Sequence, residues 1–133
     1  MFKLFVVTPE KVVFEQEVRS IIAPGSEGYL GVLTDHAPLI TALMPGSLNV
    51  VDADHKRTEY CISGGFLEVS CNIATVLADA IEKIEEIDIE RARAAEQRAR
   101  DRLSHRNDPE IDAVRAEAAL ARALNRQKMA LRK

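Results

Sequence analysis

The sequence predicts an α+β protein in which an N-terminal antiparallel β-sandwich or flattened barrel is followed by a C-terminal antiparallel two-helix hairpin. All six aromatic residues and all six glycines precede residue 67. The charge also divides: residues 1–80 carry 10 acidic and 5 basic side chains, whereas residues 81–133 carry 11 and 13. We therefore predict a β-sandwich domain over 1–80, a linker over 81–87 and a helical hairpin over 88–133.

Residues 1–80 contain seven short runs that are typical of strands, because β-branched and aromatic residues favour extended backbone. Turn-forming pairs separate these runs, among them Thr8-Pro9, Pro24-Gly25, Pro45-Gly46 and Gly64-Gly65. Many strands with no helix between them indicate an antiparallel sandwich or flattened barrel. The predicted strands are Phe2–Val7, Val18–Ala23, Tyr29–Leu33, Leu48–Val51, Glu59–Ser63, Phe66–Ser70 and Ile73–Ala78.

The C-terminal part is rich in Ala, Arg and Glu and contains no glycine. Asp88 suits an N-cap for a first helix over Ile89–Arg106. Asp108 is the predicted N-cap of a second helix, with Pro109 at its first position and an end near Leu131. A connection of about three residues requires the two helices to fold back on one another.

Alanine dominates the predicted contact between the two helices. Because a buried methyl group contributes only about 0.8 kcal/mol, we expect a weakly held hairpin that is able to open. The predicted contact residues are Ala92, Ala95, Ala99 and Leu103 on the first helix and Ala116, Leu120, Ala123 and Leu131 on the second.

Composition limits the possible functions. No run of 18 apolar residues is present, and the first residues do not resemble a signal peptide, so we expect a cytosolic protein. Cys61 and Cys71 lie in predicted strands and lack metal-site spacing, which favours reduced core thiols. The net charge of −3 does not favour a nucleic-acid partner. Nucleotide-loop, nucleophile-elbow and zinc-protease motifs are missing from the sequence, so we predict no catalytic or metal site.

Arginines recur with the same spacing on both predicted helices, at intervals of seven and then four residues. Arginine is the side chain best suited to bind phosphate in a bidentate manner, so two such stripes could hold one anion. The alternative is a solvated face whose arginines pair with Glu90, Glu96 and Asp101. The stripes are Arg91, Arg98 and Arg102 on the first helix and Arg115, Arg122 and Arg126 on the second.

Several segments, in order along the whole chain, resemble the epsilon subunit of bacterial rotary F-type ATP synthases. Thr34-Asp35 departs from the family pattern, which commonly has Pro-Gly before the turn histidine. The matching segments are Pro24–Leu33, His36–Leu39, Ser63–Val69, Thr75–Ala78, Ile87-Asp88-x-x-Arg91-Ala92, Arg115–Glu117 and Ala121–Ala123.

The resemblance implies a non-catalytic, regulatory subunit. In that family the β-sandwich docks at the foot of the central stalk, against the gamma subunit and the ring of c subunits. The hairpin switches between a folded state and an extended state that reaches the alpha/beta hexamer and inhibits ATP hydrolysis. The implied location is peripheral, on the cytoplasmic face of the bacterial membrane, through the complex only.

The resemblance also implies that no cofactor is required and that ATP is a regulatory ligand of the folded hairpin. A rival hypothesis is a free-standing ATP sensor, which would bind ATP tightly without a gamma-type partner. The ATP-site residues carried over from the family are Glu82, Ile87, Asp88, Arg91, Ala92, Arg98, Arg122 and Arg126.

Overall fold

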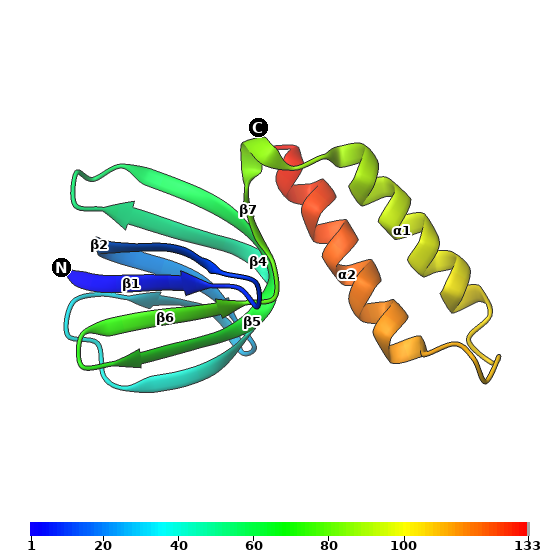
Figure 1. Cartoon of the computed structure of the whole chain (residues 1–133), viewed down its shortest axis with the longest axis horizontal. Helices are drawn as coiled ribbons and strands as arrows, with labels where there is room; N and C mark the ends of the chain where they lie inside the picture. Colours follow the sequence, from blue (N-terminus) through cyan, green and yellow to red (C-terminus); the bar gives the residue numbers. More distant parts are fainter. Residues whose placement is uncertain (133) are drawn as a thin grey trace. The chain divides into compact units, whose positions relative to one another are not determined.

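The computed structural model describes residues 1–132, which form two compact units, the first spanning Met1–Lys83 and the second beginning at Ile84. The first unit is a β-sandwich and the second is a helical hairpin (Figure 1), so the predicted fold class is confirmed. The division falls three residues after the predicted end of the β-sandwich at residue 80.

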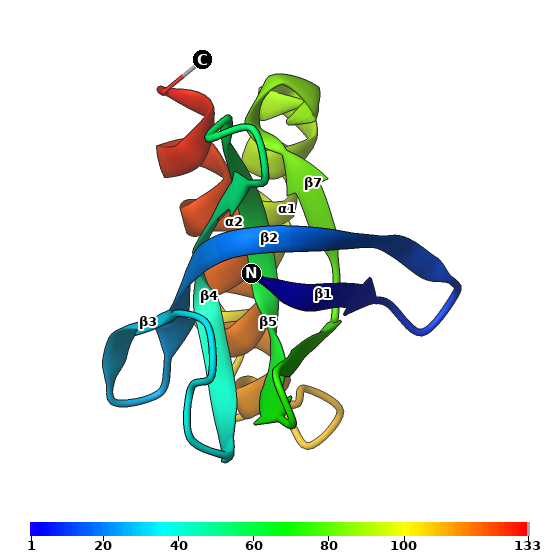
Figure 2. The same ribbon diagram turned by 90° about the vertical axis from the view of Figure 1, so that its left-hand side faces the viewer.

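The first unit contains long strands that bend from one layer of the sandwich to the other (Figure 2). The strands are β1 (Phe2–Val7), β2 (Val12–Gly25), β3 (Gly28–Val32), β4 (Leu39–Asp52), β5 (Arg57–Ser70), β6 (Ile73–Ala78) and β7 (Ile81–Lys83).

The strands close into a ring. Their order is β1-β6-β5-β4-β2-β3, and β1 also pairs with β2. Strand β2 spans the closure, because its first part pairs with β1 and its second part pairs with β4. The strand pairs are antiparallel, as predicted, except that β1 runs parallel to β6.

Three predicted turn pairs lie in strands instead, and the first of them, Pro24-Gly25, forms the end of β2. Pro45-Gly46 belongs to β4 and Gly64-Gly65 belongs to β5, so the two runs predicted around Gly64 form one strand. Gly64 and Gly65 have φ values of +105° and +140°, which residues with a side chain rarely adopt. A Cβ at Gly65 would also overlap the Leu77 carbonyl oxygen. The glycines therefore let β5 bend where β6 comes close, without ending the strand.

Alternating residues of the strands fill one core between the two layers. Strand β1 shows the pattern directly, with Phe2, Leu4 and Val6 buried and the residues between them only partly so. The core also includes Val18, Ile21, Leu48, Val50, Ile62, Leu67, Val69, Ala74 and Val76.

The two cysteines differ in position. Both are free thiols, but only Cys61 is buried. Cys71 is exposed in the turn between β5 and β6, so the prediction that both lie in core strands is wrong for this residue. The short strand predicted to end at Ser70 leaves Cys71 to the turn, where its φ is +51°.

The predicted linker over 81–87, within which the two units divide, has regular structure. Ile81–Lys83 form β7, which pairs with β5 at Tyr60–Ile62. A short 3₁₀ helix, η1 (Ile84–Glu86), follows, and Ile84 and Ile87 are buried. Apolar residues at 81, 84 and 87 provide the burial that a free linker would lack.

Helix α1 (Ile89–Ser104) begins as predicted: the Asp88 carboxylate accepts hydrogen bonds from the backbone N–H groups of Glu90 and Arg91. Helix α2 spans Ala113–Ala130, and its N-cap is Asp112, so the predicted start at Pro109 is wrong.

Helix α2 begins later than predicted because the connection between the helices forms a turn of its own. The Asp108 carboxylate accepts from Glu110 N–H, while its carbonyl accepts from Ile111 N–H, which closes a separate turn. Asp112 then caps the helix by accepting from Arg115 N–H at 3.0 Å. The hairpin is antiparallel all the same (Figure 1), but its connection is longer than predicted.

Small side chains line the contact between α1 and α2. Ala92, Ala99, Ala116 and Ala123 are almost completely buried, as the sequence predicts. Leu131 is 81% exposed, so its predicted place in the contact is wrong, and the buried residues near this end are Met129 and Ala130. No helix among the described residues is long and apolar enough to cross a membrane.

Candidate functional site

Four of the five buried alanines in the hairpin follow an arginine: Arg91, Arg98, Arg115 and Arg122 directly precede Ala92, Ala99, Ala116 and Ala123. One residue is about 100° of helix rotation, so each arginine lies beside the contact. In an antiparallel pair, residues that precede the contact positions of both helices lie on the same side of the hairpin. Arg102 and Arg126 follow Arg98 and Arg122 by four residues and lie on the same side. We call all six residues, Arg91, Arg98, Arg102, Arg115, Arg122 and Arg126, the arginine flank.

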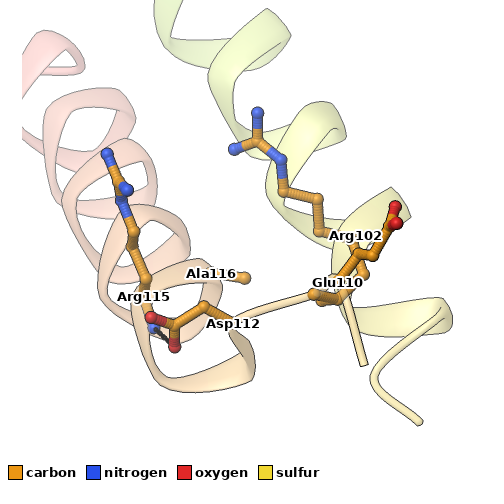
Figure 3. A pocket seen from close by; sticks show the side chains of 6 residues that line it. Arg102, Glu110, Asp112, Arg115 and Ala116 are labelled. Carbon is orange, nitrogen blue, oxygen red and sulfur yellow. Dashed lines mark hydrogen bonds between the residues drawn. The ribbon is translucent and has the colours of Figure 1, made fainter. Parts of the chain in front are cut away.

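A cavity at the tip of the hairpin supports this arrangement. It has a volume of about 310 Å³, and Arg102 of α1 and Arg115 of α2 both line it. Figure 3 shows the two guanidinium groups pointing along the helices, away from the carboxylates of Asp112 and Glu110. The two stripes predicted from the sequence therefore meet on one flank, at least at this end.

The arginine flank extends from the tip towards the other end of the hairpin. With a rise of 1.5 Å per residue, Arg98 lies about 6 Å beyond Arg102, and Arg122 lies about 10 Å beyond Arg115. Arg91 and Arg126 both lie about 16 Å from the tip pair. The flank is thus an extended row of cations, with members from both helices.

The three acidic residues expected to pair with the arginine stripes instead contact other side chains. Glu90 binds Arg93 at 2.9 Å, Glu96 binds Arg100 at 2.7 Å, and Asp101 accepts from Gln97. Within residues 1–132, no side-chain hydrogen bond or ion pair involves five of the flank arginines: Arg91, Arg98, Arg102, Arg115 and Arg122. The predicted pairing of these stripes with Glu90, Glu96 and Asp101 is therefore wrong, whereas the choice between a solvated face and an anion site stays open.

The predicted ATP-site residues have different environments. Arg91 and Arg98 are exposed, and Arg122 and Arg126 are half-buried. Ile87 and Ala92 are 2% and 0% exposed, so they can only shape the wall of a site.

Two further members of the predicted set are acidic. Asp88 is exposed, but one carboxylate oxygen is engaged in capping α1. Glu82 lies in β7, in the first unit, and its participation stays a prediction.

The opposite side of the hairpin carries paired charges. Glu96 accepts from Gln127 of α2 at 2.7 Å and from Arg100 at 2.7 Å. The hydrogen bond from Gln127, and then the one from Arg100, lowers the pKa of the Glu96 carboxyl. Arg106 pairs with Glu117 on the same side. The hairpin thus has one side with internally satisfied charges and one side with a row of arginines.

The β-sandwich has a second candidate surface. Ala42, Phe66 and Leu77 are directly opposite one another on β4, β5 and β6, so their side chains share one face. Phe66 is 56% exposed and Leu77 is 48% exposed. On the same face, Ile40 and Ile73 are also exposed. We call these five residues the apolar strip.

The face of the apolar strip also contains an acidic residue and adjoins a hollow. Glu68 lies between Ile40 and Thr75 in the register, and so gives the apolar strip a polar centre. A hollow of about 390 Å³, lined by residues that include Pro38, Ile40 and Glu68, adjoins it. A contiguous exposed apolar patch with a polar component is typical of a protein-interaction surface.

The apolar strip was not predicted from the sequence. Its members lie within runs that read simply as strands, and only the cross-strand register brings Ala42, Phe66 and Leu77 together. The outward alternation of Ile73, Thr75 and Leu77 is the one signal that could have indicated it.

The fold and these surfaces define a class: a two-domain protein that pairs a β-sandwich bearing an interaction surface with a helical hairpin bearing a cationic flank. Among residues 1–132, no group of His, Cys, Asp or Glu side chains could hold a metal ion.

Comparison with known proteins identifies the family. Residues 1–84 match the beta-sandwich domain of the ATP synthase delta/epsilon chain, and residues 85–130 match its long alpha-helix domain. The chain is 50% identical to the ATP synthase epsilon chain of Desulforamulus reducens over 128 residues, 96% of each protein. It is 49% identical to that of Moorella thermoacetica, over 96% of this chain and 94% of the relative. The chain belongs to the ATP synthase delta/epsilon chain family.

Solved structures show the same fold. A chain of the Euglena gracilis mitochondrial ATP synthase, in a structure of OSCP, F1 and the c-ring, superposes with a TM-score of 0.73 at 28% identity, covering 98% of this chain and 80% of that one. A chain from the Tetrahymena thermophila central stalk and c-ring has a TM-score of 0.61 at 16% identity, over 98% and 93% of the two chains. The latter likeness concerns the fold alone.

The lowered pKa of Glu96 predicts a pH dependence of hairpin stability. The folded form holds the pKa below the ordinary value of 4.5, so the contribution of Glu96 is fully present above that value. It is lost as the pH falls through the lower pKa of the folded form. Thermal unfolding of the helices, followed by circular dichroism between pH 7 and pH 3, should show a smaller acid-induced loss for Glu96→Gln than for the wild type. Identical pH profiles would contradict this assignment.

Proposed function

We propose that this chain is a non-catalytic subunit in the central stalk of a proton-translocating ATP synthase, where it couples rotation of the c-ring to the catalytic head. Family membership over both domains is the observation that carries the proposal. The Euglena relative, seen in a structure with F1 and the c-ring, supports the same assembly. In this role the chain performs no chemistry and acts by docking and by changing conformation.

The β-sandwich docks on the stalk. Its partners are the gamma subunit and the ring of c subunits, and the apolar strip provides a face of suitable character for such a contact. Phe66 is the best anchor, because exposed aromatic side chains contribute much of the binding energy at protein interfaces. The chain reaches the cytoplasmic face of the bacterial membrane through this complex.

The hairpin regulates ATP hydrolysis. In its folded form it stays clear of the alpha/beta hexamer, and in an extended form it inhibits. The thin alanine contact between α1 and α2 supports such a change, because few buried atoms oppose opening.

ATP binds the folded hairpin at the arginine flank. Neighbouring guanidinium groups repel one another, and a triphosphate provides the opposite charge together with acceptors for bidentate hydrogen bonds. Arg91, Arg98, Arg122 and Arg126 would hold the phosphates, and Asp88 would contact the adenine. Ile87 and Ala92 form the wall, and Glu82 completes the set carried over from the family.

The expected effect of ATP is moderate. A ligand that binds only the folded form contributes about 2.7 kcal/mol at a hundredfold excess over its Kd. Reversing a 1:99 population requires about 5.5 kcal/mol. ATP therefore shifts the hairpin without locking it, as a sensor of ATP level requires.

The rival proposal is a free-standing ATP sensor. Family membership over the β-sandwich domain and the exposed apolar strip favour the subunit, because a sensor alone needs neither. Capture of the chain from solubilised bacterial membranes separates the two: a stalk subunit brings alpha, beta and gamma subunits with it, whereas a free sensor does not.

Substituting Phe66 tests docking by the apolar strip. Phe66→Glu replaces the largest apolar side chain of the strip with a charge, so affinity for the gamma subunit should fall at least about tenfold. The measurement is binding to the purified gamma subunit by biolayer interferometry. Val12→Glu is the matched control, because Val12 is also exposed in the sandwich but lies outside the strip. Equal affinity of Phe66→Glu and wild type would reject the strip as the docking face.

Calorimetric titration with ATP tests the arginine flank. Arg98→Ala and Arg122→Ala should each weaken binding about tenfold or more, because each removes a charge-assisted contact to phosphate. Arg93→Ala is the control, since Arg93 pairs with Glu90 and is outside the flank. The absence of any heat from the wild type at millimolar ATP, or equal affinities for all four proteins, would exclude this site.

A further inference from the structure

Two polar contacts join α2 to the α1 side of the hairpin. Gln127 Nε2 donates to Glu96 Oε1 at 2.7 Å, and Arg106, just beyond the end of α1, pairs with Glu117 of α2. The pairs Arg93–Glu90 and Arg100–Glu96 differ from these, because both partners belong to α1. Of these four contacts, the pairs Gln127–Glu96 and Arg106–Glu117 are the ones that break when the helices separate.

Both contacts lie on the side of the hairpin opposite the arginine flank. Glu117 directly follows the buried Ala116, whereas the flank arginines directly precede buried alanines. Glu96 and Gln127 follow Ala92 and Ala123 by four residues, which places them about 40° beyond the contact in the same rotational direction. One edge of the hairpin therefore has polar contacts between the helices, and the other edge has the arginine flank.

We propose that the Glu96–Gln127 and Arg106–Glu117 contacts form a latch that holds the hairpin folded in the absence of a ligand. ATP acts on the other edge, so the latch and the ligand contribute independently. The ligand part of this inference rests on the proposed function, whereas the latch itself does not.

The geometry suits this role. Both carboxylate oxygens of Glu96 are engaged, one by Gln127 and the other by Arg100, so Arg100 positions the carboxylate for the contact across the hairpin. Glu117 and Gln127 are ten residues apart, about 15 Å along α2, so the latch holds the hairpin at two separate levels. Between these levels the contact consists mainly of alanine, which makes the polar contacts a substantial part of what resists opening.

Native-state amide hydrogen exchange measures the opening directly, because protection reports the closed-to-open equilibrium. We expect Gln127→Ala and Glu117→Ala each to lower the protection of α1 and α2 amides about 1.5- to 5-fold, the range for exposed polar pairs. The two factors should multiply in the double variant, because the sites are far apart. Alanine is the best helix former, so lost protection cannot come from a weaker helix.

Two controls make the result specific. Glu90→Ala removes a pair within α1 and should leave the protection of α2 amides unchanged. Amides of the β-sandwich serve as an internal reference and should be unchanged in every variant. Unchanged α1 and α2 protection in the double variant, or an equal loss in Glu90→Ala, would overturn the latch.

Adding ATP separates the latch from the proposed ATP site. If the two edges act independently, millimolar ATP raises helix protection by the same factor in the wild type and in the double variant. A gain that disappears in the double variant would overturn the independence of the latch. If ATP gives no gain in the wild type, the ATP site is rejected, while the ATP-free comparison still decides the latch.

Discussion

The behaviour of the hairpin depends on the contact between the alanine faces of α1 and α2. Ala92, Ala99, Ala116 and Ala123 let the helix axes come close, but each buries only a methyl group, worth about 0.8 kcal/mol. A contact this thin leaves the balance between folded and open forms to the polar groups along its edges. In the proposed regulation, the arginines that precede these alanines and the charged pairs on the opposite side would determine the state of the hairpin.

The β-sandwich, unlike the hairpin, is held together by extensive packing and strand pairing. Its strands close into a ring through the pairing of β1 with β2, and long strands pass between layers around a continuous apolar core. Such a body resists deformation, because opening it would break backbone pairing and expose core residues together. In the proposed role, the apolar strip would thus remain a constant docking surface while the hairpin changes. A rigid β-sandwich and a weakly held hairpin suit that role, in which the subunit stays bound while its hairpin moves.

The sequence predicts the fold class because composition and periodicity both change near residue 80. It does not predict that Gly64-Gly65 bends a strand, since the same glycines are equally typical of a turn, and only the approach of β6 to Gly65 decides between them. Asp108-Pro109 resembles a helix start, but Asp112 caps α2 because Asp108 already closes a turn with Ile111.

For the site, the spacing of the arginines reveals the stripes, because helix periodicity is a local property. The pairing of Glu96 with Gln127 and the composition of the apolar strip depend on the register between distant segments, which no local pattern specifies.

Regulation by the hairpin is the central claim, and ATP hydrolysis by the reconstituted synthase tests it most directly. Complexes would carry either the full chain or a chain that ends at Ile87, and equal incorporation would be verified for both. The account predicts faster hydrolysis with the shortened chain, and the largest difference at low ATP, where the hairpin is least often held folded. Equal rates for the two complexes at every ATP concentration would contradict the account.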